Sequence, residues 1–118
     1  MITIKRIYEA YDPHDGYRIL VDRLWPRGVK KETAHIDEWM KDIAPSPGLR
    51  KWFDHDPAKW AVFSKKYDAE LDANAAAVAA MKKCAKEQEK ITLLYGAKDE
   101  EHTHALVLQQ FLKKHRIT

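Results

Sequence analysis

The chain has 118 residues, of which 45% are hydrophobic and 33% are charged. This balance is typical of one globular domain with its own core, here spanning residues 1–118, and it excludes an intrinsically disordered chain. The formal net charge is only +3, because 18 acidic residues accompany 21 basic ones. A mild excess of positive charge suits a small anionic partner better than a nucleic acid.

Compartment and redox state are indicated by the cysteine content and the N-terminal residues. Cys84 is the only cysteine, so an intrachain disulfide and a cysteine metal cluster are excluded. The beginning of the chain lacks the long apolar stretch of a signal peptide, and no apolar run approaches the length of a membrane span. We expect a cytoplasmic protein, a monomer or homodimer, that does not associate with membranes.

Three segments are predicted to form β-strands. Residues 2–8 and 17–23 have β-type apolar patterns, and residues 91–95 are continuously apolar, as is typical of a strand buried on both faces. Only eight residues, 9–16, separate the first two strands. A parallel crossover usually needs about a dozen or more, so an antiparallel first pair is an open alternative.

Other segments carry apolar residues at helical spacing. Ser46-Pro47 and Asp56-Pro57 are typical helix starts, each with an N-capping side chain followed by proline. The helix after Asp56-Pro57 has one apolar stripe, formed by Trp60, Phe63, Tyr67 and Leu71. Strands that alternate with helices predict the α/β class. The other predicted helices cover residues 36–43, 48–53, 74–89 and 102–114.

A charged and aromatic cluster follows the second predicted strand: Asp22, Arg23, Trp25, Arg27 and Gly28. Ligands of open α/β sheets bind beyond the carboxyl ends of the strands, so this cluster is a candidate site. The two guanidiniums can hold a phosphate or a carboxylate, and Asp22 can orient one of them or act as a base. Trp25 offers a face to a planar ring, and Gly28 allows the backbone to approach an anion closely. The structural alternative is an internal ion pair between Asp22 and an arginine, with Trp25 in the core.

A second cluster follows the third predicted strand: Lys98, Asp99, His102 and His104. The start of the last helix and the nearby cation favour an anion, and either histidine can act as a general acid or base near neutral pH. The alternative is that Asp99 caps the helix and that one histidine packs inside. Since histidines at positions i and i+2 of a helix do not share a face, we predict no metal site, and we predict no cofactor.

A third cluster, Arg50, Lys51, Trp52 and His55, lies at the end of the helix predicted over residues 48–53. Arg50 and Lys51 can border a basic cleft. Trp52 is better explained as a core residue, because the apolar stripes of helices normally pack. We therefore expect at most the two cationic side chains of this cluster to face a ligand.

Three long segments of the chain, residues 15–32, 44–71 and 91–108, resemble a known bacterial family. The motifs VDRLWPRG, at 21–28, and LRKWF followed by HDP, at 49–57, are specific to it. On these motifs the chain is identified as a member of the YeaO-like branch of the family called domain of unknown function 488.

The resemblance implies a small, mostly parallel sheet of three to four strands with helices on both faces. It also implies strand ends at residues 22–28 and 95–99. The family has no established biochemical activity. Some members carry a Cys-His-Arg motif after the last strand, whereas this chain has His102-Thr103-His104 there, so a cysteine mechanism is not supported.

We predict that the protein binds a phosphate- or carboxylate-bearing small molecule between these two strand ends. The enzymatic version of this prediction is acid–base hydrolysis or group transfer, with Asp22, His102 and His104 as the catalytic residues. The predicted ligand-binding residues are Arg23, Trp25, Arg27, Gly28, Lys98 and Asp99. The alternative is a protein without catalytic activity: a stress- or metabolite-responsive adaptor, or a weak nucleic-acid binder that uses Arg23, Arg27, Arg50 and Lys51.

Overall fold

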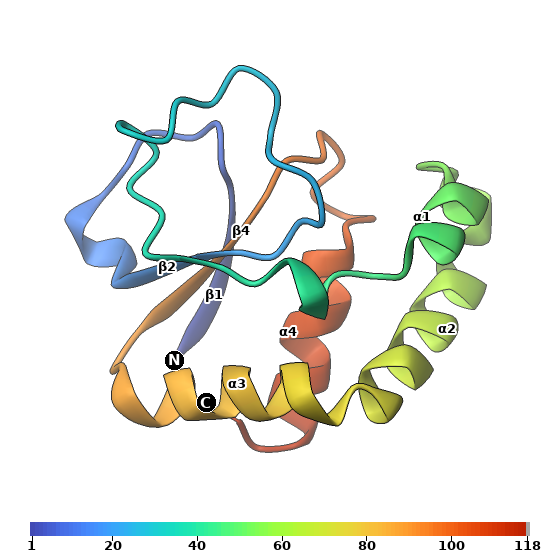
Figure 1. Ribbon diagram of the computed structural model, residues 1–118. Helices are drawn as coiled ribbons and strands as arrows, with labels where there is room; N and C mark the ends of the chain where they lie inside the picture. Colours follow the sequence, from blue (N-terminus) through green and yellow to red (C-terminus); the bar gives the residue numbers. More distant parts are fainter. Residues whose placement is uncertain (118) are drawn as a thin grey trace.

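Four strands form one parallel sheet in this computed structural model, which describes residues 1–117 (Figure 1). Each neighbouring pair of strands is parallel. The predicted α/β class and the mostly parallel sheet are confirmed. In their order across the sheet, the strands are β1 (Ile2–Arg6), β4 (Ile91–Tyr95), β2 (Tyr17–Leu20) and β3 (Glu38–Trp39).

β4 lies between the first two strands of the chain, and its residues are all buried, as its apolar sequence predicts. β1 and β2 therefore do not pair with each other, and the antiparallel alternative does not occur. The connection between them crosses over β4 and contains only a 3-10 turn, η1 (Pro13–Asp15). Thr92 Oγ1 of β4 donates to the carbonyl oxygen of Asp15 at 2.7 Å. Because this crossover lies directly against the sheet, it needs fewer residues than one that carries an α-helix.

The α-helices cover one face of the sheet (Figure 1). Side chains from all four join one core with Ile19 and Leu93, which point to this face of β2 and β4. Phe63, Tyr67 and Leu71 are buried in this core, so the predicted apolar stripe is confirmed. The helices are α1 (Pro47–Phe53), α2 (Trp60–Ala73), α3 (Ala75–Glu87) and α4 (His104–Lys114).

The second face of the sheet is covered mainly by irregular backbone. Leu20 and Leu94 point to this side and pack against Ile7 and Trp25. Helices were predicted on both faces, but within the described residues this second face carries only the 3-10 turn η1. The physical reason is that residues 22–37 contain proline, glycine and many charged side chains, without an apolar repeat that could form a helix stripe.

The predicted helix over residues 36–43 is wrong. This segment forms β3 and then a 3-10 turn, η2 (Lys41–Ile43). The N–H of Asp37 donates to the carbonyl oxygen of Arg18 at 2.9 Å, and the N–H of Met40 donates to that of Leu20 at 2.9 Å. So short a helix is marginal in water, and these bonds to β2 favour the extended conformation.

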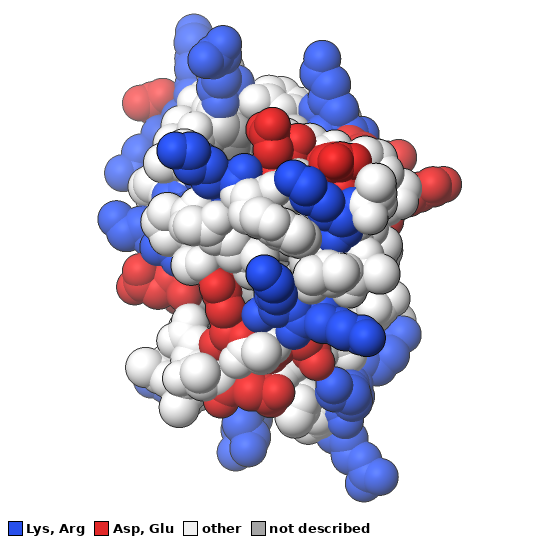
Figure 2. All heavy atoms as spheres, turned by 90° about the vertical axis from the view of Figure 1, so that its right-hand side faces the viewer, with Lys and Arg blue, Asp and Glu red and all other residues white. Residues whose placement is uncertain are grey.

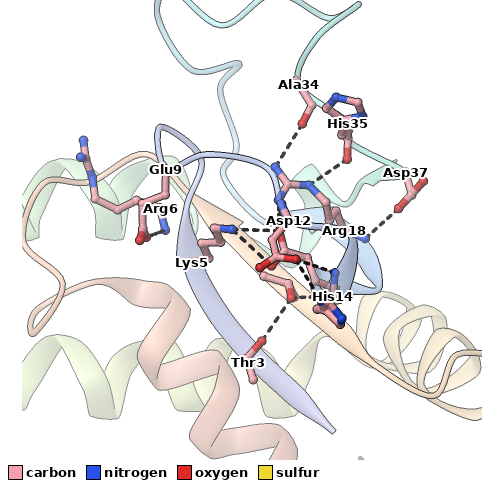
Figure 3. A network of polar contacts seen from close by, with 12 residues as sticks. Thr3, Lys5, Arg6, Glu9, Asp12, His14, Arg18, Ala34, His35 and Asp37 are labelled. Atoms are coloured by element: carbon pink, nitrogen blue, oxygen red, sulfur yellow. Dashed lines mark hydrogen bonds and ion pairs between the residues drawn. The ribbon is translucent and has the colours of Figure 1, made fainter.

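A buried ionic network fixes η1 and the start of β3 to the sheet (Figure 3). The guanidinium of Arg18 forms an ion pair with Asp15 and donates to the carbonyl oxygens of Ala34 and His35. Lys5 Nζ lies 3.0 Å from the Asp15 carboxylate. Burial opposes ionisation of Asp15, but hydrogen bonds from Lys5, the backbone and Arg18 outweigh it, so the pKa of Asp15 is lowered.

Asp15→Asn is expected to lower the free energy of unfolding by about 3 kcal/mol, because it leaves the buried Arg18 and the half-buried Lys5 without their carboxylate. Since the pKa of Asp15 is lowered in the fold, the stabilisation is present above about pH 4 and is lost as acid protonates the group. Denaturant unfolding measures both effects. Asp68→Asn is the control, because its ion pair with Lys114 is exposed and contributes less than about 1 kcal/mol. Equal losses in the two variants would contradict the prediction.

Candidate functional site

A cavity of about 330 Å³ lies at the carboxyl ends of β2 and β4. Its walls come mainly from the segment after β2, the segment that contains α1, and the loop between β4 and α4 with the start of that helix. Tyr8, after β1, and Phe63, of α2, complete the lining. The parallel sheet explains why these parts meet, since the carboxyl ends of parallel strands lie at the same edge. We call this cavity the strand-end cleft.

Asp22 joins the ends of the two central strands. Its Oδ2 accepts a hydrogen bond from the backbone N–H of Gly96 at 2.8 Å. A Cβ atom on Gly96 would lie 3.1 Å from the same oxygen, so glycine allows this close approach. Oδ1 of Asp22 is buried without a hydrogen-bond partner among the described residues, and lies 3.3 Å from Nε2 of His104.

His104 is the first residue of α4, and its ring is held by the end of β2. Nε2 lies 2.9 Å from the carbonyl oxygen of Val21, to which it donates. Burial lowers the pKa of His104 and raises that of Asp22, because each charged form would lose its hydration. Each partner opposes the shift of the other. The neutral imidazole, with Nε2–H engaged, leaves Nδ1 as the nitrogen for any exchange of protons with a ligand.

The three arginines of the cleft differ in their contacts. Arg23 donates through Nε to the carbonyl oxygen of Pro45 and through Nη2 to that of Ala44, so its guanidinium holds the segment before α1. The side chains of Arg27 and Arg50 line the cleft and are exposed. Within residues 1–117, neither of these two guanidiniums has a hydrogen bond or an ion pair. Arg27 and Arg50 are therefore the donors available to an anion.

His102 lies in the wall of the cleft, but its predicted neighbours do not. Nδ1 of His102 lies 2.7 Å from Oδ2 of Asp99, whose other oxygen accepts the N–H of Glu101 at 2.9 Å. Asp99 thus orients the ring and closes a turn before α4, whereas the residue that caps the helix is Thr103 and not Asp99. Neither Asp99 nor the exposed Lys98 lines the cleft.

Trp25 and Gly28 were also predicted to bind the ligand. Trp25 lines the cleft, but its Nε1 donates to the carbonyl oxygen of Val29 at 2.7 Å and its ring packs edge-on against Trp39. Gly28 lies outside the cleft, in a turn with a positive φ of 77°. Its role here is to allow that turn.

Sequence reasoning missed Tyr8 and Gly96 as individual residues of the cleft. The hydroxyl of Tyr8 donates to the carbonyl oxygen of Arg27 at 2.8 Å, which fixes the backbone beside that guanidinium. Tyr8 follows β1 by two positions and Gly96 follows β4 directly. The signal that could have found them is the rule already applied to Asp22, that residues just past the carboxyl ends of parallel strands converge.

The described residues contain neither a metal-ligand cluster nor a membrane-spanning helix. No three histidine, cysteine, aspartate or glutamate side chains within residues 1–117 are grouped so that they could hold a metal ion. None of the helices in this part of the chain is long and apolar enough to cross a membrane.

Comparison with known proteins identifies the family. The family profile described as "Inactive DUF488-N3 subclade" matches residues 1–117. The chain belongs to this family. The uncharacterized protein YeaO of Escherichia coli (strain K12) is 46% identical over 112 residues, which cover 95% of this chain and 96% of YeaO. The predicted YeaO-like resemblance is thereby confirmed.

Two mycobacterial proteins are also similar. The uncharacterized proteins Rv3073c of Mycobacterium tuberculosis (strain ATCC 25618 / H37Rv) and Mb3100c of Mycobacterium bovis (strain ATCC BAA-935 / AF2122/97) are each 38% identical over 111 residues. These residues cover 94% of this chain and 92% of each relative. No solved structure matches the chain significantly.

The imidazole of His104 is expected to titrate with a midpoint below about 6.5, the usual value for histidine. NMR spectra of the side chain recorded against pH measure the midpoint, with a short histidine peptide in the same buffers as control. Asp22→Asn removes the carboxylate that favours the charged ring, so the midpoint falls further. Because the unfolded chain binds this proton at higher pH, the free energy of unfolding declines as the pH falls below about 6.5. A midpoint at or above that of the peptide would contradict a buried neutral imidazole.

Proposed function

We propose that this protein binds a phosphate- or carboxylate-bearing small molecule in the strand-end cleft. One observation carries the proposal: the described lining holds three arginines and three histidines but a single acidic residue, Asp22. The carboxylate of Asp22 is engaged with Gly96 and faces His104, so it does not pair with the arginines. A cavity with unpaired guanidiniums and few competing carboxylates favours an anion.

The proposal is one of binding without turnover. The family is described as an inactive subclade. The chain has His102-Thr103-His104 at the start of α4, where the family resemblance implies a Cys-His-Arg motif in some members. Thr103 does not replace it as a nucleophile, because it is 1% exposed and its hydroxyl accepts the N–H of Ala105 as a helix cap.

Acid–base hydrolysis or group transfer is the second candidate function. The 3.3 Å separation between Asp22 Oδ1 and His104 Nε2 favours it, because a carboxylate beside an imidazole is a common arrangement in acid–base catalysis. The engagement of Nε2 by the Val21 carbonyl argues against it, since only Nδ1 remains for the ligand. Turnover of any phosphoester or carboxylic ester that is lost in Asp22→Asn would favour this candidate over simple binding.

Binding of a nucleic acid has less support than binding of a small anion. Figure 2 shows basic side chains interspersed with acidic and uncharged ones on the face that carries α1 and α2, whereas a polyanion favours a continuous basic stripe. Arg23, one of the four residues predicted for this role, donates to backbone carbonyls instead. A non-catalytic adaptor stays a prediction.

Inorganic phosphate is expected to raise the melting temperature in proportion to the logarithm of its concentration, at constant ionic strength. A ligand at 100 times its Kd stabilises the fold by about 2.7 kcal/mol, which corresponds to several degrees in a chain of this size. Arg27→Ala and Arg50→Ala are each expected to weaken binding by about tenfold, because each removes a charged donor.

Lys98→Ala is the matched control, since this exposed cation belongs to the loop between β4 and α4 but does not line the cleft. The same loss of effect in Lys98→Ala as in the arginine variants would indicate nonspecific screening. The absence of any shift across phosphate and small carboxylates would overturn the proposed function.

A further inference from the structure

We propose that the ligand of the strand-end cleft is a small organic dianion, of the class of phosphomonoesters and dicarboxylates. This inference rests on the proposed function and narrows its ligand. It depends on the charge of the lining, on the elements that carry Arg27 and Arg50, and on the apolar surface beside them.

The lining carries two uncompensated positive charges. Apart from its three histidines, it has three guanidiniums and one carboxylate. The charge of Arg23 persists although its hydrogen bonds go to the uncharged carbonyls of Ala44 and Pro45. A ligand with two negative charges therefore leaves the cleft neutral, whereas a monoanion leaves one positive charge inside it. Arg23 is half-buried whereas Arg27 and Arg50 are exposed, so water screens part of this difference in charge, and what is left of it favours the dianion.

Asp22 offsets one unit of charge in this count, but within the described residues its carboxylate forms no ion pair with Arg27 or Arg50. Oδ2 of Asp22 accepts the N–H of Gly96 at 2.8 Å, and Oδ1 is buried beside His104. The nearest ionic partner of Asp22 in the described chain is thus the histidine and not an arginine.

The two free arginines reach the cleft from different elements. Arg27 belongs to the segment after β2, and Arg50 to the last turn of α1. Two donors on separate elements can share one phosphoryl group or hold two carboxylates of one molecule. Two negative charges match both arrangements better than one, and the cavity of about 330 Å³, at the small end of ligand pockets, restricts the ligand to a small molecule.

The ligand also has an apolar part. Phe53 and Phe63 line the same cavity, and their rings stack with centroids 4.2 Å apart. Both rings are nearly buried, but Leu24 also lines the cavity and is 60% exposed. This leucine offers carbon surface to the skeleton of a ligand, which inorganic phosphate does not use. An organic phosphomonoester is therefore expected to bind more tightly than inorganic phosphate.

The experiment compares ligands that differ by one charge. Methyl phosphate is paired with dimethyl phosphate, and succinate with its monomethyl ester, at about pH 8, where a phosphomonoester is a dianion and imidazoles are neutral. Titration calorimetry at constant ionic strength gives each Kd. The dianion of at least one pair is expected to bind about tenfold or more tightly than its monoanionic partner. The pair that shows this preference distinguishes a phosphomonoester from a dicarboxylate.

Arg27→Gln and Arg50→Gln are each expected to reduce the ratio between the dianion and the monoanion toward one. Both side chains are exposed, and circular dichroism checks that the variants remain folded. Lys98→Gln is expected to leave the ratio unchanged, because this residue does not line the cleft. If a glutamine variant fails to fold, lysine replaces the same arginine. Lysine keeps the positive charge but lacks the fork of donors, so both affinities are expected to fall while the preference for the dianion over the monoanion is kept.

The outcomes separate the two proposals. Equal affinities within both pairs overturn the dianion inference but leave anion binding in place. No detectable binding of any of the four compounds overturns the proposed function together with the inference. A preference that persists unchanged in both glutamine variants also overturns the inference, because the charge would then be recognised elsewhere.

Discussion

The parallel pairing of β4 with both β1 and β2 is the constraint on which the rest of the structure depends. Because all three strands run in the same direction, their carboxyl ends lie at one edge of the sheet. This arrangement brings Asp22 to Gly96, although 74 positions separate them in the chain. The same pairing divides alternate side chains of β4 between two cores, with Leu93 under the α-helices and Leu94 under irregular backbone.

The irregular cover of the second face is held by specific polar bonds, since it buries little apolar surface. Arg18 is 2% exposed, and its guanidinium donates to two backbone carbonyls of the segment before β3. Arg23 does the same for the segment before α1. Arginine serves this role because its fork of donors can satisfy several carbonyls at once. Arg18 and Arg23 thus stabilise the fold, whereas Arg27 and Arg50 keep their donors free.

Asp22 has both a structural and an electrostatic role. Its carboxylate accepts the N–H of Gly96 and so connects the ends of the two central strands. This structural role explains why an acidic residue lies inside a cationic cleft. The cost is a half-satisfied carboxylate, because Oδ1 has no hydrogen-bond partner within residues 1–117 and lies 3.3 Å from His104 Nε2. This accounts for the opposite pKa shifts of the two residues, because neither charged form is well hydrated at that depth.

The sequence by itself determined the α/β class, the three longest strands, the apolar stripe of α2 and the general place of the cleft. These features depend on local periodicity, on capping signals such as Ser46-Pro47, and on the convergence of strand ends. Only the tertiary structure decided that β4 separates β1 from β2, and that residues 38–39 form a strand. Both results depend on backbone hydrogen bonds between distant segments, such as Met40 N–H to the Leu20 carbonyl, which local propensity does not encode. The fold also determines that Arg23 is engaged and that Arg27 and Arg50 are free, because a guanidinium donates to whichever backbone carbonyls the fold brings near it.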